Sequence, residues 1–588
     1  MWSYTGQGIK AMNLHKFITD AINEKLAAAP TLSGADLSNV AVEVPKVREF
    51  GDFATNAAMV LARNNRLSSP ASTQCEGRGP RAIAEQILPD IAALPFVADA
   101  SIAGPGFINI KLKDEFILEF LARPTDTTAK PLVIDLDYGG YNIGKDLHIG
   151  HLRTTIVGDT YNRIAKYLGH KTKSYNHMGD WGRPMGLIIA WILEHGMPGN
   201  ADELNTMYPA STTRAKEDSQ WMDKARQITA DLQSGNVEYK KIYDAFAKIT
   251  LDQMNEVLQR MNIMPFDMDM GEYGLYRYVP ELQKILEDRG LLIESDGALV
   301  VNVKQDDDTA PMPPVMFQTG TGANTYGTAD LTAVYYRAIT DKPDVLGYFT
   351  DSRQNLHFTQ IFRAAKLAKL TDATLFHIGF GTITGPNGKP FKTRDGAVPS
   401  LNDMVDMVEG AVRARVVESG KNLPDETVEM IALAALKFND LMHDVKSDYI
   451  FDADAVTQFE GRTGPYILYT AVRLKSVDRK AKSEGNKTPA LCDLQPATLS
   501  NDERNLLLTL LDFDRAINAA FDKRATDILA NYTYDLCQDI NTFYHNCPIL
   551  RDDVDAATRA HRLGIVRAAL DTLSRAIDLM GLKIPEEM

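Results

Sequence analysis

The chain has 588 residues, more than the roughly 250–300 that one hydrophobic core usually serves, so we expect several domains. With 44% hydrophobic and 24% charged residues, and no apolar run near the ~18 residues of a membrane span, the sequence predicts a water-soluble globular protein that does not enter a membrane. The net charge of −15 disfavours a general nucleic-acid coat, although a local basic patch could still bind RNA.

The N-terminal part predicts a small, self-contained α/β domain at residues 1–124. Its first residues lack the apolar core and cleavage pattern of a secretory signal, so we expect a cytoplasmic protein. A surface loop is expected at 67–80 and a linker at 124–130. The four cysteines form no CxxC pair, which predicts neither a disulfide framework nor a metal site. We expect helices at Leu14–Ala29, Phe50–Leu61 and Pro80–Leu88, and an alternating strand at Phe107–Lys113.

At Pro131 the pattern becomes that of a nucleotide-binding α/β unit. Pro131–Tyr138 is a short apolar run typical of a buried parallel strand, and a glycine-interrupted loop and a helical pattern over Gly150–Leu168 follow it. We place this domain at 125–400, with a mostly helical insertion at about 200–265, and a helical domain at 401–588. Further strands are expected at Lys171–Asn176, Leu291–Val303, Asp344–Thr350 and Leu375–Phe380.

The most specific local motif is His148-Ile149-Gly150-His151, at the predicted turn into the first helix of this unit. A glycine and free N–H groups at a helix N-terminus favour a phosphate, and imidazoles can donate hydrogen bonds to phosphate oxygens as charge develops. With 11 His and 40 Gly in the chain, about 0.014 matches to HxGH are expected by chance. Two adjacent structural histidines, or a metal-binding pair, are the alternatives.

A second motif, Gly385–Arg394, combines Gly and Pro with Lys389, Lys392 and Arg394. Three cations within six residues would suit a triphosphate, although on its own the segment is better explained as a charged surface loop. Its interpretation as a phosphate-binding loop depends on the histidine motif.

Together these motifs resemble the HIGH and KMSKS motifs of class I aminoacyl-tRNA synthetases, and the residues around them resemble the arginyl-tRNA synthetase family. The chain departs from that family at Gly139-Gly140-Tyr141, where a small residue and a proline are usual, at Met316–Thr328, and in the length of the loop 67–80. The similar segments run from about Met12 to Met588: Gly51–Asn56, Ala103–Asn109, Asp137–Lys145, His151–Asp159, Asn176–Gly182, Leu232–Tyr239, Arg353–His357, Gly385–Arg394, Gly464–Arg473 and Gly581–Met588.

The resemblance implies a multidomain fold that combines α/β and all-α parts: a Rossmann-like catalytic core, a small N-terminal α/β tRNA-binding domain and a C-terminal helical anticodon-binding bundle. It also implies the site residues. The catalytic residues would be His148, His151, Lys389, Lys392 and Lys145. ATP would be bound by His148, Gly150, His151 and Lys392. Arginine would be bound by Asp137, Asn142, Tyr326, Asp330 and Gln354. The tRNA anticodon would be contacted by Tyr469, Arg473, Tyr544 and Met588.

Several of these residues have simpler explanations. Asp137 ends an apolar strand, which is a costly place for a carboxylate without a ligand or partner. Tyr326 and Asp330, at i and i+4, would share one helix face and could bind one guanidinium, or could be a packed tyrosine and a capping aspartate. Asn142 and Gln354 could be backbone-bonded amides, Lys145 a surface lysine, and the tyrosines of the helical domain ordinary core residues.

The implied activity is that of an arginine–tRNA ligase, which forms arginyl-adenylate from L-arginine and ATP, with Mg²⁺, and transfers arginine to tRNA(Arg). We expect a monomer that needs tRNA bound before activation, and no editing domain, because a charged guanidinium discriminates strongly. Two rival functions remain: a nucleotidylyltransferase that does not use tRNA, and a non-catalytic RNA-binding relative. The long helical C-terminal part disfavours the first, and the intact histidines and lysines disfavour the second.

Overall fold

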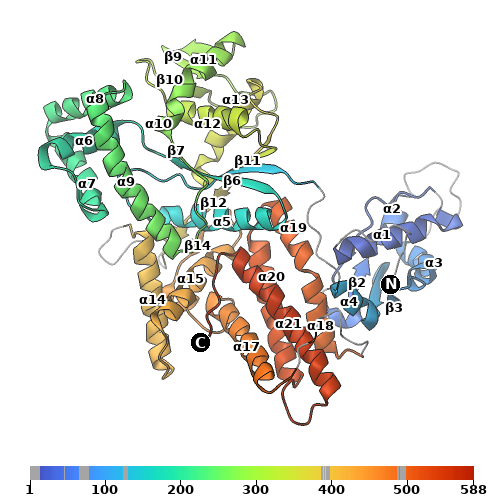
Figure 1. Ribbon diagram of the computed structural model, residues 1–588. Coiled ribbons are helices and arrows are strands. Elements are labelled where there is room, and N and C mark those ends of the chain that lie inside the picture. Colours follow the sequence, from blue (N-terminus) through green and yellow to red (C-terminus); the bar gives the residue numbers. More distant parts are fainter. Residues whose placement is uncertain are drawn as a thin grey trace. The chain divides into compact units, whose positions relative to one another are not determined.

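The computed structural model describes residues 13–32, 34–45, 47–64, 79–122, 130–385, 388–389, 391, 398–486, 489 and 498–588 (Figure 1). The chain forms two compact units. The terminal unit comprises Met1–Thr127, Tyr469–Ala519 and Asn531–Ala576, and the central unit comprises Thr128–Leu468, Ala520–Ala530 and Ile577–Met588. Within the described ranges no helix is both long and apolar enough to span a bilayer.

The central unit is built on a five-stranded sheet in the order β12-β11-β5-β6-β7, in which every neighbouring pair is parallel. The expected parallel α/β core is therefore confirmed. Its strands are β5 (Val133–Asp137), β6 (Lys171–Met178), β7 (Met268–Gly271), β11 (Val345–Asp351) and β12 (Thr374–Phe380).

The alternation of side chains along β5 separates an apolar face from a polar one. Ile134 and Leu136 join the core cluster that contains Val157 of helix α5 (Leu152–Tyr167). Asp135 and Asp137 point to the opposite face, where Asp137 contacts helix α12 (Tyr326–Thr340). The central strand is thus buried on both sides, but only one side is hydrophobic.

The predicted strand at Leu291–Val303 exists, but not in the parallel sheet. It forms β8 (Leu292–Ser295) and β9 (Ala298–Val301), which pair antiparallel with each other and with β10 (Val315–Gln318) in a separate sheet. Asp296-Gly297 forms the two-residue turn between β8 and β9, and this Asp-Gly pair is a hairpin signal that the strand prediction overlooked. Beside this sheet lie α11 (Val279–Asp288) and α13 (Asn355–Leu367), whereas α10 (Glu272–Leu275) packs against β7 and α12.

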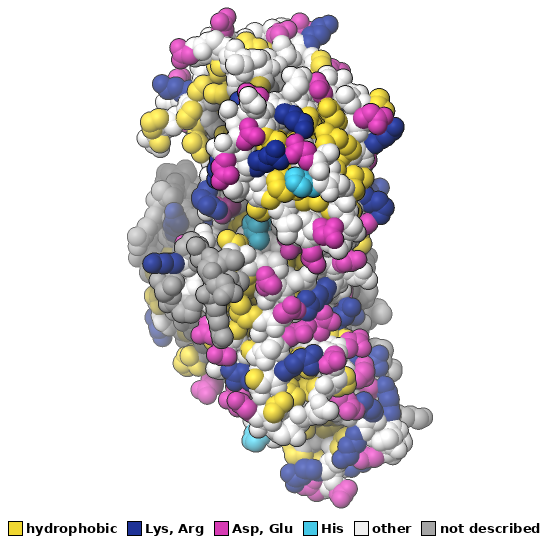
Figure 2. All heavy atoms as spheres, turned by 90° about the vertical axis from the view of Figure 1, so that its left-hand side faces the viewer, with side chains coloured by type: hydrophobic (Ala, Val, Ile, Leu, Met, Phe, Trp, Pro, Cys, Tyr) yellow, Lys and Arg dark blue, Asp and Glu magenta, His cyan; other side chains and the backbone are white. Residues whose placement is uncertain are grey.

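The helical insertion is present and follows α6 (Arg183–His195) as α7 (Ala201–Glu217), α8 (Ser219–Gln233) and α9 (Val237–Arg260). Its apolar residues share one cluster around Trp221 and Phe246. Basic and acidic side chains are interspersed over the face seen in Figure 2, in keeping with i,i+4 pairs such as Lys248–Asp252 on α9.

A buried lysine of the first helices after residue 400 joins two distant chain segments within the central unit. Lys437 is fully buried, and its Nζ donates to the carbonyl oxygens of Met261 (3.1 Å) and Gly581 (2.9 Å). Burial lowers the pKa of Lys437 to about 8, while Asp159 of α5 opposes that shift. The elements here are β13 (Ile383–Thr384), α14 (Leu401–Glu418), α15 (Asp425–Leu441), β14 (Tyr449–Ile450), α16 (Ala453–Val456) and α17 (Gly464–Ser483).

The terminal unit contains an antiparallel sheet in the order β1-β2-β4-β3. The sequence predicts a single helix at Phe50–Leu61, and this prediction is wrong. Phe53–Thr55 forms strand β2, and helix α2 begins only at Ala57. The bounds are α1 (Leu14–Ala27), β1 (Val42–Glu43), η2 (Arg48–Phe50), α2 (Ala57–Asn64), α3 (Pro80–Ala92), β3 (Val97–Ala103), β4 (Phe107–Leu112), α4 (Asp114–Leu121), α18 (Asn501–Leu511), α19 (Phe513–Lys523), α20 (Asp527–Asn546) and α21 (Ala556–Leu579).

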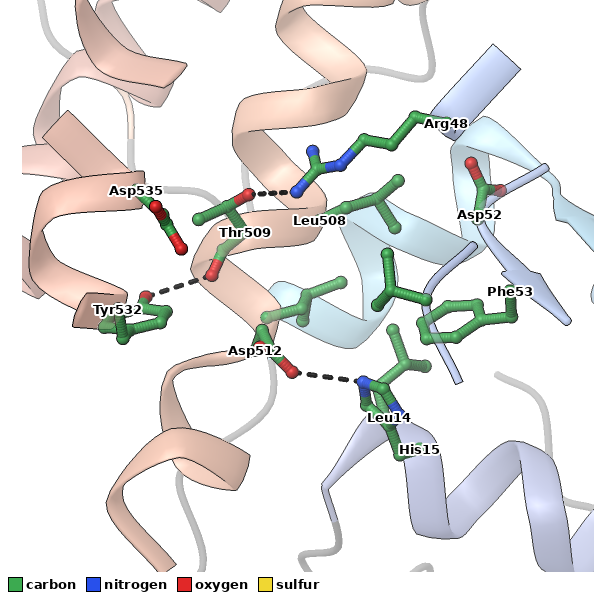
Figure 3. Close-up of a pocket in the computed structure, with 12 residues that line it drawn as sticks. Leu14, His15, Arg48, Asp52, Phe53, Leu508, Thr509, Asp512, Tyr532 and Asp535 are labelled. Atoms are coloured by element: carbon green, nitrogen blue, oxygen red, sulfur yellow. Dashed lines mark hydrogen bonds and ion pairs between the residues drawn. The ribbon is translucent and has the colours of Figure 1, made fainter. Parts of the chain in front are cut away.

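The N-terminal segment of this unit shares buried charges with the C-terminal helices, whereas the sequence analysis expects it to be self-contained. Arg504 of α18 pairs with Asp52 and Asp114 and donates to the carbonyl oxygen of Leu112 (2.6 Å). A cavity of about 90 Å³ lies beside this cluster. Figure 3 shows His15 facing Asp512 and Arg48 facing Thr509 across it.

Replacing Arg504 with Met should destabilise the terminal unit by about 3–5 kcal/mol, because it leaves the buried Asp52 carboxylate without a counter-charge. The matched control is Arg48→Met, whose half-exposed side chain bridges the same segments and should cost about 1 kcal/mol or less. The measurement is the midpoint of urea unfolding. Equal midpoints for the two variants would contradict the assignment of Arg504 as the main link.

Candidate active site

The two histidines of the HIGH motif hold each other at the start of α5. His148 precedes the short helix η3 (Ile149–His151), and its Nδ1 accepts from the backbone N–H of Gly150 (3.1 Å). The Nδ1 of His151 accepts in turn from the backbone N–H of His148 (3.2 Å), and the two rings stack with centroids 4.0 Å apart. The motif is therefore a rigid helix cap as well as a pair of imidazoles.

These contacts define the protonation state of both rings. A ring nitrogen that accepts from a backbone N–H carries no proton, so each neutral imidazole has its proton on Nε2. Burial, followed by His148 and Lys145, lowers the pKa of His151 to about 3. Burial and then Lys145 also lower the pKa of His148. Both side chains are thus neutral hydrogen-bond donors through Nε2 near neutral pH.

The unusual Gly139-Gly140-Tyr141 turn has a packing explanation. A Cβ on Gly139 would lie 2.3 Å from Oδ1 of Asn176, so only glycine fits against β6. The buried Tyr141 bonds Thr155 of α5 (2.8 Å) and places its ring edge-on to that of His151, 5.4 Å away. The residue that departs from the expected proline therefore supports His151.

The glycine of the HIGH motif has a second role. A Cβ on Gly150 would lie 2.8 Å from the ring of His148. Besides its predicted role of letting a phosphate approach the backbone, Gly150 leaves room for the His148 ring that caps the helix.

Both ends of the downstream lysine-bearing segment attach near the HIGH motif. On its far side, Ile149 donates to the carbonyl oxygen of Pro399 (3.0 Å), and His148 pairs with Ser400. On its near side, the buried Arg153 of α5 donates to the carbonyl oxygens of Gly381 (3.0 Å) and Ser447 (2.8 Å). The residues that flank the second motif are therefore held close to the first motif, and Arg153, which sequence reasoning missed, is one cause.

The predicted lysines fall in different surroundings. Lys145 follows the turn after β5, and its Nζ lies 4.7 Å from the ring centroid of Tyr208. Lys389 is exposed in a turn in which the N–H of Gly385 donates to its carbonyl oxygen (2.8 Å). Lys392 and Arg394 lie outside the described residues, so their predicted roles remain predictions.

The predicted arginine pocket starts at the carboxyl end of β5. Asp137 is buried, and its Oδ2 accepts from a guanidinium nitrogen of Arg337 (2.6 Å). The same oxygen is 3.7 Å from Nδ1 of His177, which lies near the end of β6. The strand-end carboxylate thus has a cationic partner within the protein, a partner that the sequence did not reveal.

Tyr326 and Asp330 do begin a helix, as their spacing requires for a shared face, because α12 starts at Tyr326. Asp330 accepts from Nε2 of His357 (2.6 Å) and lies 3.6 Å from Nδ1 of His177. The Tyr326 ring is exposed, with its centroid 5.0 Å from that of His357. His177 therefore stands between the carboxylates of Asp330 and Asp137.

The two predicted amides lie at the same edge of the sheet. The backbone of Asn142 forms a parallel bridge with Gly179, where a Cβ would lie 2.6 Å from the Asn142 side-chain oxygen. Gln354 is exposed and ends the short helix η5 (Ser352–Gln354), which directly follows β11. Both amides stay predictions as arginine ligands.

Glu272 is an acidic residue of this edge that the sequence analysis missed. It directly follows β7, and burial, then Asp330 and Asp180, raises its pKa to about 8. Asp180 accepts from the hydroxyl of Tyr243 (2.6 Å), and a Cβ on Gly271 would collide with its carboxylate. A glutamate directly after a strand could have indicated this role. The strand has only four residues and comes soon after the helical insertion, so it was not recognised in the sequence.

Three of the four predicted anticodon residues meet in the terminal unit. The guanidinium of Arg473 lies 4.8 Å from the ring centroid of Tyr469 and 5.0 Å from that of Tyr544. Arg473 also donates to Asn541. Met588 belongs to the central unit, where its backbone oxygen accepts from Lys421 (3.3 Å). The arrangement of the first three is compatible with stacking on a base and pairing with a phosphate.

Three family models match the chain in succession. They are the N-terminal domain of arginyl-tRNA synthetase over residues 13–112, the catalytic domain of class I tRNA synthetases (R) over 118–453, and the DALR anticodon binding domain over 467–588. The catalytic match alone covers more than half of the chain. The expected fold class is confirmed.

Curated relatives and solved structures agree with these matches. The arginine–tRNA ligase of Alkaliphilus oremlandii is 34% identical over 97% of this chain and 98% of its own length. That of Hyphomonas neptunium is 34% identical over 92% of this chain and 94% of its own length. The fold is similar to arginyl-tRNA synthetases from Plasmodium falciparum (TM-score 0.81, 23% identity, 99% of this chain and 100% of that one) and Thermus thermophilus (0.80, 23%, 98% and 100%).

His151 should be neutral, with its proton on Nε2, at about pH 5, where an ordinary histidine is mostly charged. In the unfolded chain the ring of His151 would take up its second proton at the ordinary histidine pKa of about 6.5. Because the folded protein resists this protonation, lowering the pH below about 6.5 should favour unfolding. Nitrogen NMR of labelled histidine, assigned by the signal lost in His151→Gln, measures the tautomer. A protonated His151 signal at about pH 5 would refute the assignment.

Proposed function

The chain belongs to the arginyl-tRNA synthetase family, and on that premise we propose that it is an arginine–tRNA ligase whose active site is the carboxyl edge of the central sheet. The observation that carries this site assignment is the presence of two complementary halves at that edge. One half offers the Nε2–H groups of His148 and His151, and the other has more carboxylates than cations.

The imidazole half suits a triphosphate. Neutral Nε2–H donors approach phosphate oxygens without the cost of burying a charge, and their hydrogen bonds strengthen as negative charge builds. Lys145 adds a positive charge close to both rings, and Lys389 and Lys392 would approach from the segment anchored at Pro399. No general base is needed, because the attacking group is already a carboxylate.

The carboxylate half suits the guanidinium of arginine. Asp330 and Glu272 face each other from α12 and α10, and Asp137 stands behind His177. A planar, permanently charged group with forked donors fits carboxylates in a partly dry pocket. Asn142 and Gln354 would bind the α-amino and carboxylate groups of the same substrate.

In this arrangement an oxygen of the arginine carboxylate attacks the α-phosphorus in line. The new C–O–P linkage of the adenylate forms as the bond to pyrophosphate breaks. A hydroxyl of the terminal tRNA adenosine then attacks the activated carbonyl, AMP leaves with the electron pair of the broken C–O bond, and the hydroxyl proton passes to a phosphate oxygen of AMP or to water. Positioning and charge stabilisation by residues of this chain supply the catalysis in both steps.

Magnesium would enter with ATP. Among the residues described in the structure no cluster of three or more His, Cys, Asp or Glu could hold a metal, and the groups beside the phosphate half are imidazoles and lysines. Mg²⁺ held mainly by phosphate oxygens and water fits such surroundings. The ion would neutralise part of the charge on the phosphates.

The helical domain would bind the anticodon loop of tRNA(Arg) through Tyr469, Arg473 and Tyr544, with Met588 as a further contact. We further propose a cytoplasmic monomer. The three-domain division at residues 124 and 400 remains part of this proposal.

Exchange of labelled pyrophosphate into ATP tests the function directly. Exchange should require arginine and increase when tRNA is added, and His151→Ala should slow it without a matching loss of arginine binding. A tRNA-independent nucleotidylyltransferase would exchange without arginine, and a non-catalytic protein would not exchange at all. Either result would overturn the proposal.

Asp330→Asn should lower kcat/KM for arginine, with a loss of transition-state stabilisation of about 2 kcal/mol or more. The reason is that the change removes one member of a desolvated charge pair. It should also narrow the preference for arginine over citrulline, whose neutral urea keeps the shape but loses the charge. The control is Asp288→Asn, an exposed change on α11 that should alter neither quantity. Unchanged rejection of citrulline by Asp330→Asn would remove Asp330 from the pocket.

Arginine binding should release a proton from Glu272. Its raised pKa of about 8 keeps the carboxyl mostly protonated at neutral pH, and an incoming guanidinium favours the charged form. Affinity should therefore rise with pH up to about 8, by as much as tenfold per unit, and then level off. Calorimetry between about pH 6.5 and 8.5 measures this slope. Glu272→Gln should remove that contribution, and an equal slope in both proteins would exclude Glu272.

A further inference from the structure

The predicted pocket already contains a guanidinium of the protein itself. Arg337 lies seven residues, or about two helical turns, beyond Asp330 on α12, and it is 2% exposed. Its terminal nitrogen donates to Oδ2 of Asp137 at 2.6 Å, and both side chains are buried. A contact this short between buried opposite charges is a charge-assisted hydrogen bond with little competition from water.

Two aromatic rings hold Arg337 in this position. Its guanidinium carbon lies 4.3 Å from the ring centroid of Tyr175 and 5.3 Å from that of Tyr348. These residues are the register partners of Asp137 on β6 and β11. A planar guanidinium uses such ring faces better than an ammonium does, so the site fits arginine more closely than lysine.

Asp137 makes the direct hydrogen bond to Arg337, and two other aspartates lie nearby. Asp341 accepts from Lys173 (2.8 Å) and from the hydroxyl of Tyr175, so it has its own cation. Asp135 lies on the same face of β5, and burial, then Asp341, raises its pKa to about 7. Near neutral pH Asp135 is therefore only partly ionised, so it competes for Arg337 less than an ordinary aspartate would.

We propose that Arg337 is a positioning residue that neutralises and fixes Asp137, so that Asp330 and Glu272, and not Asp137, discriminate the guanidinium of the substrate. The inference rests on the proposed function of this pocket and changes the role given to one of its residues. By fixing Asp137, Arg337 also helps to fix the position of the His177 ring, whose Nδ1 lies 3.7 Å from Asp137 and 3.6 Å from Asp330.

This arrangement predicts that one substitution repairs another. Asp137→Asn leaves the cation of Arg337 unpaired beside the pocket, where it repels arginine but not citrulline. The preference for arginine should fall about tenfold or more. Adding Arg337→Met removes the repelling charge and should restore the preference to within about threefold of the wild type, because a buried ion pair can be replaced as a unit.

The experiment measures kcat and KM for arginine, citrulline and ATP by pyrophosphate exchange in the full chain. The variants are Asp137→Asn, Asp137→Asn with Arg337→Met, and Arg337→Lys, which keeps the charge and should stay closer to wild type than Asp137→Asn. Changes should appear in KM for arginine, with KM for ATP within about twofold, which a general loss of structure would not produce. If the double variant fails to fold, Asp137→Asn with Arg337→Gln replaces it.

The proposal is overturned if Asp137→Asn keeps the wild-type preference, or if the double variant discriminates no better than Asp137→Asn. Asp330→Asn, made alone and in the double variant, separates this from failure of the pocket assignment. If Asp330→Asn leaves citrulline rejected in both backgrounds, the pocket lies elsewhere, whatever Arg337 does. The other outcome is that Asp330→Asn narrows the preference for arginine over citrulline in both backgrounds, while the double variant without it keeps the wild-type preference. That result supports both the pocket assignment and the role of Arg337.

Discussion

The parallel pairing of β5 with β6 and β11 is the interaction on which the rest of the central unit depends. It places Asp137 level with Tyr175 and Tyr348, so three strands end at one edge. Packing of Ile134 and Leu136 under α5 fixes which way β5 faces. A slip of one residue would turn the carboxylates toward α5 and the apolar side chains toward Arg337. Hydrophobic burial on one face therefore sets the electrostatics of the other.

Those parts of the fold and site that depend on contiguous residues could be predicted from the sequence. The strand, loop and helix around His148 form a local pattern, and the spacing of Tyr326 and Asp330 is a property of a single helix. The helical insertion was visible for the same reason. The prediction was wrong at Leu291–Val303, which forms an antiparallel hairpin, because the turn signal Asp296-Gly297 within the segment was overlooked.

The residues that sequence reasoning missed act through partners from distant elements. Arg337 looks like any charged residue of a helix until β5 places Asp137 against it. His177 lies on β6 and Glu272 directly follows β7, so their shared role becomes visible only because these two strands pair side by side. Arg153 lies within the segment His151–Asp159, but its role is not visible there, because the carbonyl oxygens that it bonds come from Gly381 and Ser447. Such pairings are tertiary, and a single sequence carries no record of them.

The link between Arg504 and the N-terminal segment also has a consequence for how the chain is made. Asp52 and Asp114 leave the ribosome early, but the arginine that pairs with them lies 452 and 390 residues later. At roughly 5–20 residues per second, this delay is on the order of 20–90 seconds. Throughout that time Asp52 and Asp114 lack the charged partner that they have in the finished fold. The last helices therefore complete a domain that was synthesised first, and translation speed sets how long it must wait.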